Sequence, residues 1–250
     1  MEASGRSRPV QTAAAAILCA LSGVALVYFL FAAWHRVRYP YELEWCEGPM
    51  VDVVRRLLAG KAIYAAPSLE YTSHEYTPLY YLVAAAFSQV CGLSFFALRL
   101  VSVLSFLGAL GMLAALTWRE TRRRLWAFAA VGMLTATFGT LDGWFTIART
   151  DCLLLLLFLG TIYLLREPGM GYPRAVAAGL LLFLAFFAKQ SALVMAAPAM
   201  AFAVWRDGRR GIAFAGVAMS LILLSTLLLN AMTDQWYGYY IFKLIGQQKR

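Results

Sequence analysis

Long apolar stretches alternate with short polar segments along most of this chain. Seven of them, each about 15 to 23 residues long, are dominated by aliphatic and aromatic side chains, and a helix needs about 20 such residues to cross a bilayer. They occupy residues 12–34, 96–118, 126–141, 151–165, 174–188, 190–205 and 211–231. The pattern predicts an all-α integral membrane protein with about seven transmembrane helices, forming a single transmembrane domain over residues 1–250.

The composition agrees with a multipass membrane protein. Of the 250 residues, 62% are hydrophobic and 14% are charged, whereas soluble domains carry about 25% charged residues. The formal net charge of +9 comes mostly from Arg in short loops, where membrane orientation explains it. We therefore expect membrane lipids as partners and no nucleic acid.

Short loops rich in Arg and Lys stay in the cytoplasm, so they predict the orientation of the chain. The loops that hold four, two and three Arg are residues 119–125, 166–174 and 206–210. The loops 141–151 and 189–190 hold one basic residue each. We therefore place these three Arg-rich loops on the cytoplasmic side of a cell (inner or plasma) membrane, together with residues 1–11, which include Arg6 and Arg8.

A further apolar stretch, residues 78–92, leaves open whether the number of membrane crossings is seven or eight. If it crossed the membrane, every later loop would change side and the Arg-rich loops would face outward. It is short and begins with Pro and Tyr residues, which suits a helix at the interface. Residues 49–59 repeat apolar side chains at helical spacing and predict an amphipathic helix on the bilayer surface. We therefore predict that residues 35–95 form one extracytoplasmic segment with both surface helices, the alternative being an eighth crossing.

Three glutamates, Glu42, Glu44 and Glu47, lie close together in the sequence RYPYELEWCEGPM, where this outer segment begins. Under the predicted topology the outer side holds most of the other acids too, and orientation does not require that bias. Glu47 comes just before the 49–59 helix, where the positive end of the helix dipole keeps a carboxylate ionised, as a proton acceptor must be. The pattern favours an outward-facing site, although ordinary solvated loops would give the same charge count.

Several short motifs together resemble those of the C-type membrane glycosyltransferases. In order they are EWCEGPMVDVVRRLLAGKAIY, YTPLYY, ALRLVS, ARTD and AKQSAL. The resemblance covers roughly residues 10–245 and is closest to the family of protein O-mannosyltransferases and aminoarabinose lipid A transferases (glycosyltransferase family 39). It implies transfer of a hexosyl or pentosyl group from a polyprenyl-phosphate carrier to an acceptor hydroxyl of a protein, lipid or glycan at the outer face of the membrane. Members of that family are usually longer, so it also implies a fragment or a minimal version.

The resemblance implies that a carboxylate in the first outer loop is the catalytic base. Glu47 takes the second position of the family's Asp-Glu pair, and Cys46 stands where the Asp would be. This departure leaves two alternatives, of which we favour Glu47 over Glu44. A base positioned in this way accelerates proton transfer by about 10²–10⁴-fold.

The leaving group in such a reaction is a lipid phosphate, which needs nearby cations rather than a general acid. Arg149 and Lys189 at the outer ends of predicted spans, and Arg99 near the start of its span, are the predicted phosphate-binding residues. The alternative is that these cations reach for lipid headgroups. Asp151 would hold Arg149 in place or line the acceptor site.

The loop before the second surface helix supplies further predicted substrate-lining residues: His74, Glu75, Tyr76 and Tyr80. One His beside two carboxylates makes a poor metal site, so we expect no metal ligands and no cofactor. The segment WYGYYIFK, residues 236–243, has the composition of an aromatic belt at the membrane interface. The competing functions are a transporter or flippase-like protein and a non-catalytic lipid-binding membrane subunit.

Overall fold

A computed structural model describes residues 3–247, and the described backbone forms helices and turns without a strand. Of the predicted cytoplasmic residues 1–11, residues 1–2 lie outside this range. The helices are α1 (Ala3–Arg38), α2 (Glu47–Leu58), α3 (Leu79–Cys91), α4 (Phe95–Thr121), α5 (Arg124–Ala136), α6 (Asp151–Leu165), α7 (Tyr172–Ala188), α8 (Ala192–Asp207), α9 (Arg209–Met232), α10 (Trp236–Gly238) and α11 (Leu244–Gln247). The predicted all-helical class is confirmed for this part of the chain.

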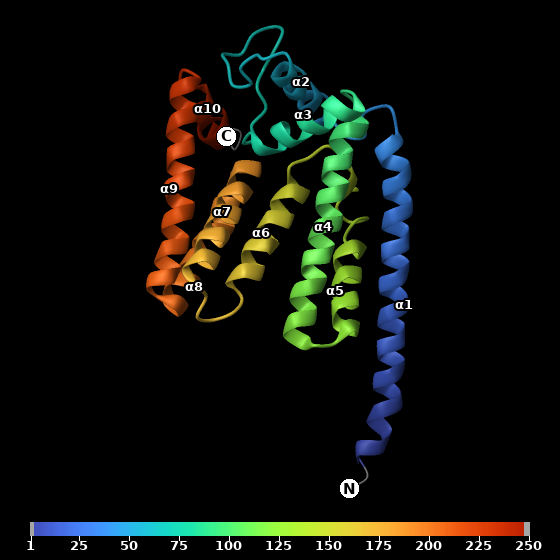
Figure 1. Cartoon of the computed structure of the whole chain (residues 1–250). Helices are drawn as coiled ribbons and strands as arrows, with labels where there is room; N and C mark the ends of the chain where they lie inside the picture. Colours follow the sequence, from blue (N-terminus) through green and yellow to red (C-terminus); the bar gives the residue numbers. More distant parts are fainter. Residues whose placement is uncertain (1–2, 248–250) are drawn as a thin grey trace.

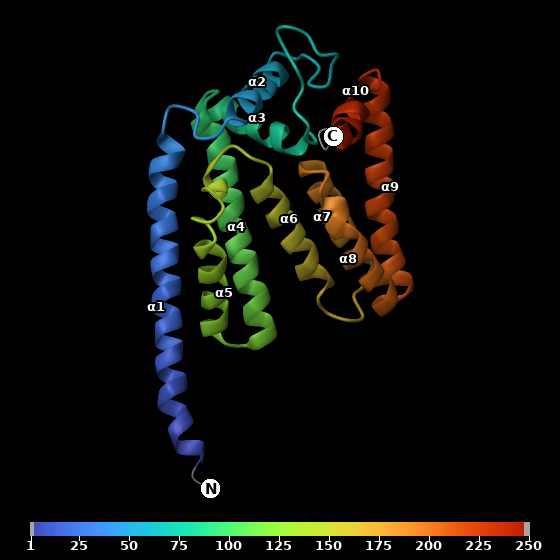
Figure 2. The ribbon, with the colours of Figure 1, turned by 180° about the vertical axis from the view of Figure 1, so that it is seen from behind.

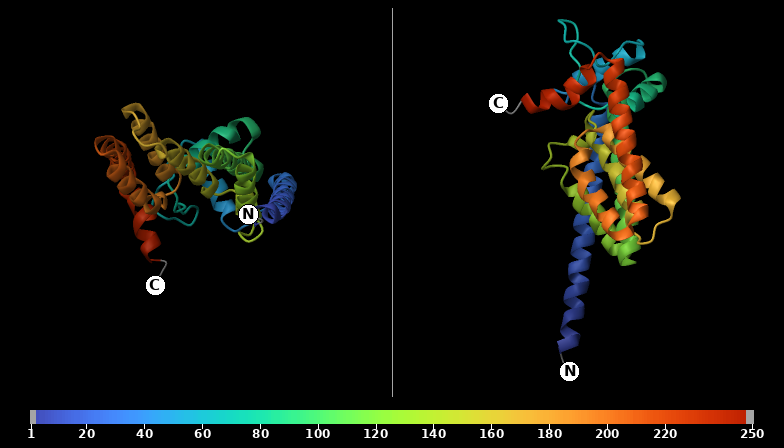
Figure 3. Two further views of the ribbon diagram at one scale, coloured as in Figure 1. Left: turned by 90° about the horizontal axis from the view of Figure 1, so that it is seen from below. Right: turned by 90° about the vertical axis from the view of Figure 1, so that its left-hand side faces the viewer.

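The long helices form a bundle, and α2 and α3 cover one of its ends (Figure 1). Helix α1 packs on α5, helices α5 and α6 pack on α4, α7 packs on α6, and α9 packs on α7 and α8. The helices therefore follow one another from α1 at one edge to α9 at the other (Figure 2). Helix α3 runs across the covered end at a wide angle to α4, whereas α1 extends past the opposite end (Figure 3).

Three helices are long and apolar enough to cross a membrane among the described residues: Thr12–Arg38 of α1, α4 and α9. Helices α5 to α8, over the other four predicted spans, have 13 to 17 residues, against about 20 for a full span. The predicted membrane protein is supported, and the count of seven spans stays a prediction. Helix α5 is shorter than its predicted span because the chain turns after Ala136.

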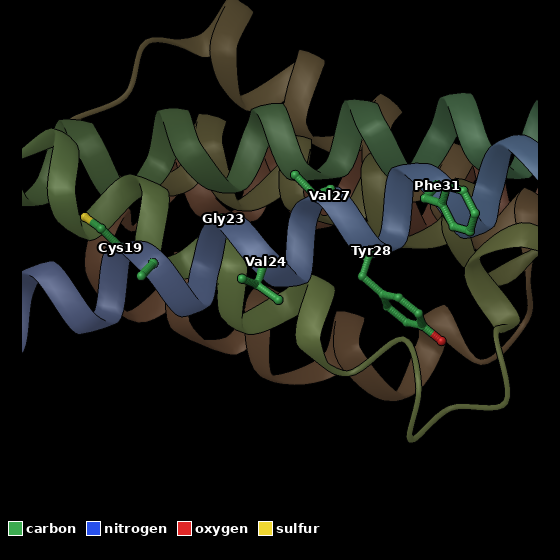
Figure 4. A pocket seen from close by; sticks show the side chains of 7 residues that line it. Cys19, Gly23, Val24, Val27, Tyr28 and Phe31 are labelled. Atoms are coloured by element: carbon green, nitrogen blue, oxygen red, sulfur yellow. The ribbon is translucent and has the colours of Figure 1, made fainter.

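Apolar side chains cover the outer faces of the edge helices, as contact with lipid requires. Val24, Val27 and Phe31 of α1 are exposed, and so are several Leu of α9. A hollow of about 510 Å³ runs along this face of α1 (Figure 4). It is lined by Cys19, Ala20, Gly23, Val24, Val27, Tyr28 and Phe31. None of these residues is charged, so the hollow offers nothing that would bind a phosphate, and we assign it to the lipid-facing surface.

Small residues let the helices approach closely where they pack. A Cβ added to Gly132 of α5 would lie 2.2 Å from the Cβ of Ser22 in α1, and one added to Gly179 of α7 would lie 2.8 Å from the carbonyl oxygen of Phe214 in α9. Both distances are too short for any side chain. Close backbone approach of this kind drives helix association in lipid, where the hydrophobic effect between helices is lost.

The apolar face predicted for the helix at 49–59 is present in α2, but it packs inward. Met50, Val53 and Val54 are buried in a cluster that also contains Tyr81 of α3 and Leu98 of α4. Helix α2 therefore rests on α3 and α4 rather than presenting this face to lipid. This packing fixes the start of α2, and with it the linker that carries the glutamates, over the end of the bundle.

Candidate active site

Glu47 and Arg99 form an ion pair inside the protein. Both side chains have no exposed surface, and the guanidinium meets the carboxylate through two hydrogen bonds, Nε to Oε1 at 2.8 Å and Nη2 to Oε2 at 2.6 Å. Arg99 also donates to the backbone carbonyls of Arg36, Tyr39 and Tyr41. One arginine of α4 therefore ties the linker between α1 and α2 to the bundle.

Two backbone N–H groups complete the surroundings of Glu47. Leu43 donates to Oε2 at 2.8 Å, and Ala148 donates to Oε1 at 2.8 Å. Burial alone would raise the pKa of the Glu47 carboxyl, but the hydrogen bonds from Arg99 and from these two N–H groups hold it below its ordinary value. Each carboxylate oxygen accepts two hydrogen bonds, so Glu47 is a fixed anion enclosed by protein.

A second group of charges lies at the same end of the bundle and reaches the surface. Arg149 lies 3.6 Å from Glu44 and 3.5 Å from Asp151, and the Nζ of Lys189 donates to Asp151 at 2.6 Å. These four side chains, which we call the charged cluster, are 11% to 29% exposed. They come from the α1–α2 linker, the start of α6 and the end of α7, and their charges alternate in sign.

Aromatic side chains surround Arg149 and Lys189. The guanidinium of Arg149 lies 4.2 Å from the ring centre of Trp144 and donates to the Tyr76 hydroxyl at 3.1 Å. The Nζ of Lys189 lies 5.1 Å from the ring centre of Tyr76. Cation–π contacts of this kind stabilise the positive charges without neutralising them. The aromatic contacts therefore give both side chains a defined position in a partly buried site.

His74 packs edge-on against Tyr76, with ring centres 4.9 Å apart. Burial lowers the pKa of His74 to about 4, and the positive charge of Arg149 acts in the same direction. The imidazole is therefore neutral at physiological pH, and it is suited to hydrogen bonding rather than to carrying charge.

Polar atoms without a hydrogen-bond partner gather around the charged cluster. Among residues 3–247 they include Nε2 of His74, Oγ1 of Thr150 and Oε1 of Gln190, all of them buried. Native proteins rarely leave buried polar atoms unpaired, and such atoms commonly bind water or a ligand. Their concentration beside Asp151 marks this end of the bundle as a place where a polar molecule would be held.

The structure brings together most of the residues that the sequence predicted for the site. Glu75 is next to the cluster, since its carbonyl accepts a hydrogen bond from Nε2 of Gln190 at 2.6 Å. Tyr80 lies elsewhere: it is fully buried and donates to the carbonyl of Leu98 at 2.8 Å. Arg99 is enclosed with Glu47, because its guanidinium is held by a carboxylate and three carbonyls. Neither Tyr80 nor Arg99 is placed to meet a substrate.

Three residues of the site were missed by the sequence analysis: Trp144, Thr150 and Gln190. Their positions in the sequence were a usable signal, because Trp144 and Thr150 share a short loop with Arg149, and Gln190 follows Lys189 directly. No group of three or more His, Cys, Asp or Glu side chains that could hold a metal ion occurs among the described residues.

Cys46 lies beside Glu44 and forms hydrogen bonds with its carboxylate. The Cys46 thiol and backbone N–H both donate to Oε2 of Glu44. Burial raises the pKa of Cys46 to about 12, and the contact with Glu44 contributes, so the thiol stays protonated and acts as a donor. The position where an Asp was expected therefore holds a neutral group that helps to orient a carboxylate.

Comparison with known families identifies a related family. The sequence model of glycosyltransferase family 87 matches residues 74–248, which include three of the four members of the charged cluster. No curated protein and no solved structure matches the chain. The match supports the predicted membrane glycosyltransferase, but it does not support the specific family of O-mannosyltransferases and aminoarabinose transferases that the motifs resemble.

Proposed function

The chain belongs to glycosyltransferase family 87, and from that premise we propose that it transfers a sugar from a polyprenyl-phosphate carrier to an acceptor hydroxyl at the outer face of the membrane. The charged cluster is the observation that carries this proposal. It combines a partly exposed carboxylate with two cations at one end of a helical bundle that has membrane-spanning helices. A glycosyl transfer from a lipid phosphate needs these groups, a base for the acceptor and positive charge for the phosphate.

The reaction assigns a separate task to each member of the cluster. The acceptor oxygen attacks the anomeric carbon of the donor as the bond between that carbon and the phosphate oxygen breaks. The phosphate keeps the electron pair of the broken bond, and Glu44 takes the proton of the acceptor hydroxyl. Arg149 and Lys189 stabilise the negative charge that the lipid phosphate gains as it leaves.

We assign the base to Glu44 rather than to Glu47. The Glu44 side chain is 20% exposed, whereas Glu47 is fully enclosed and both of its oxygens are occupied by Arg99 and backbone N–H groups. A base must come within hydrogen-bond reach of the proton that it removes, and a hydroxyl could reach Glu47 only if this network were dismantled. The preference for Glu47 that followed from the family alignment is therefore reversed in this proposal.

Asp151 positions the two cations. It lies between Arg149 and Lys189 and pairs with both, so it holds them a fixed distance apart while leaving donors free. A lysine ammonium has three N–H donors and an arginine guanidinium has five, more than the contacts within the cluster use. The remaining donors are available to the oxygens of a phosphate.

The test is a transfer assay with the protein reconstituted in membranes and supplied with radiolabelled mannosyl, glucosyl or arabinosyl polyprenyl phosphates. Transfer of label from at least one donor supports the proposal, and transfer from nucleotide sugars alone would overturn it. Lys189→Gln should raise the KM for the lipid donor and lower the rate, because the phosphate loses a cation. Lys61→Gln removes an exposed lysine of the predicted outer segment 35–95 and serves as the matched control, with no expected change.

A further inference from the structure

A polar hollow beyond the C-terminal end of α9 shares no residue with the charged cluster. Its volume is about 370 Å³, and it is lined by Asn230, Asp234, Gln235, Trp236, Gly238, Tyr239 and Lys243. We call it the α9–α10 hollow. Its lining residues belong to the end of α9, to α10 and to the turns beside them, and α10 lies at the end of the bundle that α2 and α3 cover (Figure 1). Binding sites for small molecules fall in this range of size, about 300–1,000 Å³.

The backbone around the α9–α10 hollow is held in an unusual conformation. Asp234 and Gln235 are consecutive non-glycine residues with positive φ angles of 48° and 67°, and residues Tyr239–Lys243 form a π-helical turn. Both features cost conformational energy, and both concentrate at functional sites in proteins. Their occurrence within ten residues of each other, on the wall of one hollow, is the reason to look for a ligand here.

Asn230 holds this conformation in place. Its backbone carbonyl accepts the N–H of Gln235 at 2.8 Å, and its side-chain Oδ1 accepts the N–H of Gly238 at 2.9 Å. A Cβ on Gly238 would lie only 2.7 Å from Oδ1 of Asn230, so a larger residue here would displace the Asn230 side chain from its hydrogen bond. The turn is therefore tied to the end of α9 by two hydrogen bonds.

The chemistry of the lining fits a neutral sugar. Trp236 and Tyr239 form an edge-to-face pair with ring centres 5.4 Å apart, and aromatic faces of this kind pack against the apolar C–H face of a pyranose. Asp234, Gln235 and Asn230 offer carboxylate and amide groups for hydroxyls, which both donate and accept hydrogen bonds. The charges of Asp234 and Lys243 cancel, so the lining does not favour a phosphate or another anion.

A short chain of contacts joins this hollow to the charged cluster. Tyr237 of α10 packs edge-on against Tyr64, with ring centres 5.1 Å apart. The Tyr64 hydroxyl in turn donates to the backbone carbonyl of Tyr76 at 2.7 Å, and Tyr76 contacts both cations of the cluster. The two sites therefore share one packed layer at the same end of the bundle.

We propose that the α9–α10 hollow binds one or two neutral sugar rings of a glycan acceptor, at a distance from the hydroxyl that reacts. The assignment to the acceptor rests on the proposed function, whereas the binding of a neutral oligosaccharide does not. The hollow would position a growing glycan so that its end reaches Glu44.

The experiment is saturation-transfer difference NMR on the full chain in a detergent without a sugar headgroup, with mannotriose, cellotriose and maltotriose as probes. Saturation of ring C–H protons in at least one trisaccharide is expected. Trp236→Ala should weaken its binding about tenfold, the amount that one good aromatic contact contributes. Trp205→Ala, which removes an exposed tryptophan of α8, is the matched control and should leave binding unchanged.

Two further variants keep the test decisive. Asp234→Asn preserves the shape of the hollow and should weaken binding severalfold even if Trp236→Ala does not fold. Glu44→Gln should bind the trisaccharide as the unmodified protein does, whether or not it transfers sugar. Loss of trisaccharide binding and loss of sugar transfer are therefore measured separately, so a failure of this proposal is distinguishable from a failure of the proposed reaction. Absence of saturation from all three probes, or binding that neither Trp236→Ala nor Asp234→Asn changes, would overturn the proposal and leave these aromatics as a membrane-interface belt.

Discussion

The buried pair of Glu47 and Arg99 gives the prediction that depends most directly on the described geometry. Glu47→Gln keeps the size of the side chain and replaces one carboxylate oxygen by an NH₂ group. Four donors point at this carboxylate, two at each oxygen, so two of them lose their acceptor whichever way the amide turns. An unpaired buried donor costs about 1–3 kcal/mol, which gives a loss of about 2–6 kcal/mol in the free energy of unfolding.

The cost of breaking a buried ion pair gives a similar loss in the free energy of unfolding for Glu47→Gln. The substitution leaves Arg99 charged, without a counter-ion and without exposed surface. Breaking a buried ion pair by removing one partner typically costs about 3–5 kcal/mol. Arg99 also donates to the carbonyls of Tyr39 and Tyr41 in the linker that carries Glu44, and to that of Arg36 near the end of α1. We therefore expect the linker to lose order and transfer activity to fall together with stability.

The assay is denaturant-induced unfolding of the detergent-solubilised protein, followed by intrinsic fluorescence. Asp52→Asn is the matched control, because it breaks an ion pair with Arg55 on the same helix where both side chains are more than half exposed. Exposed pairs contribute at most about 1 kcal/mol, so this variant should stay close to the unmodified protein. If Glu47→Gln unfolds with the same free energy as Asp52→Asn, the reasoning about the enclosed pair is refuted.

Three further predictions concern acidity, backbone strain and membrane orientation. The pKa of His74 falls from 6.5 in the unfolded chain to about 4 in the folded protein, so the unfolded chain binds more protons between these two pH values. The free energy of unfolding should therefore rise with pH across this window, and His74→Gln should flatten the rise. At Gln235, where φ is positive, the Gly variant should be more stable than the Ala variant by about 1 kcal/mol, and equal stabilities in denaturant titrations would contradict the assigned backbone strain. A cysteine placed at exposed Ser68 should react with a membrane-impermeant maleimide added to intact cells and one at exposed Arg122 should not; labelling of both residues, or of Arg122 alone, would contradict the predicted topology.

The sequence was sufficient to predict most of the long helices and several of the charged residues that the structure brings together. In lipid the backbone must satisfy its own hydrogen bonds, so each long apolar stretch had to be helical, and α4, α6, α7 and α9 begin and end within a few residues of their predicted spans. The members of the charged cluster were each predicted as site residues. Arg149, Asp151 and Lys189 were predicted from their places at the ends of apolar stretches, and Glu44 from the family resemblance.

The division of roles between Glu44 and Glu47 was not available from the sequence. The helix-dipole argument predicted an ionised Glu47, and its lowered pKa agrees with that. The hydrogen bonds that lower it come from Arg99, Leu43 and Ala148. Leu43 is a close neighbour in the sequence, but Arg99 and Ala148 are 52 and 101 positions away along the chain. Which charges pair across such separations is decided by the packing of α2 on α3 and α4. The packing also decides that Tyr80 points into the core rather than toward the site.

The measurement that tests the central claim most directly is the single-turnover rate of sugar transfer by Glu44→Gln, with saturating lipid donor and the rate expressed per folded molecule. The account predicts a rate about 10²–10⁴-fold below that of the unmodified protein, with little loss of stability, while Glu42→Gln, which changes an exposed glutamate two positions away, transfers normally. A Glu44→Gln protein that transfers sugar at the unmodified rate would contradict the assignment of the base and of the charged cluster as the active site.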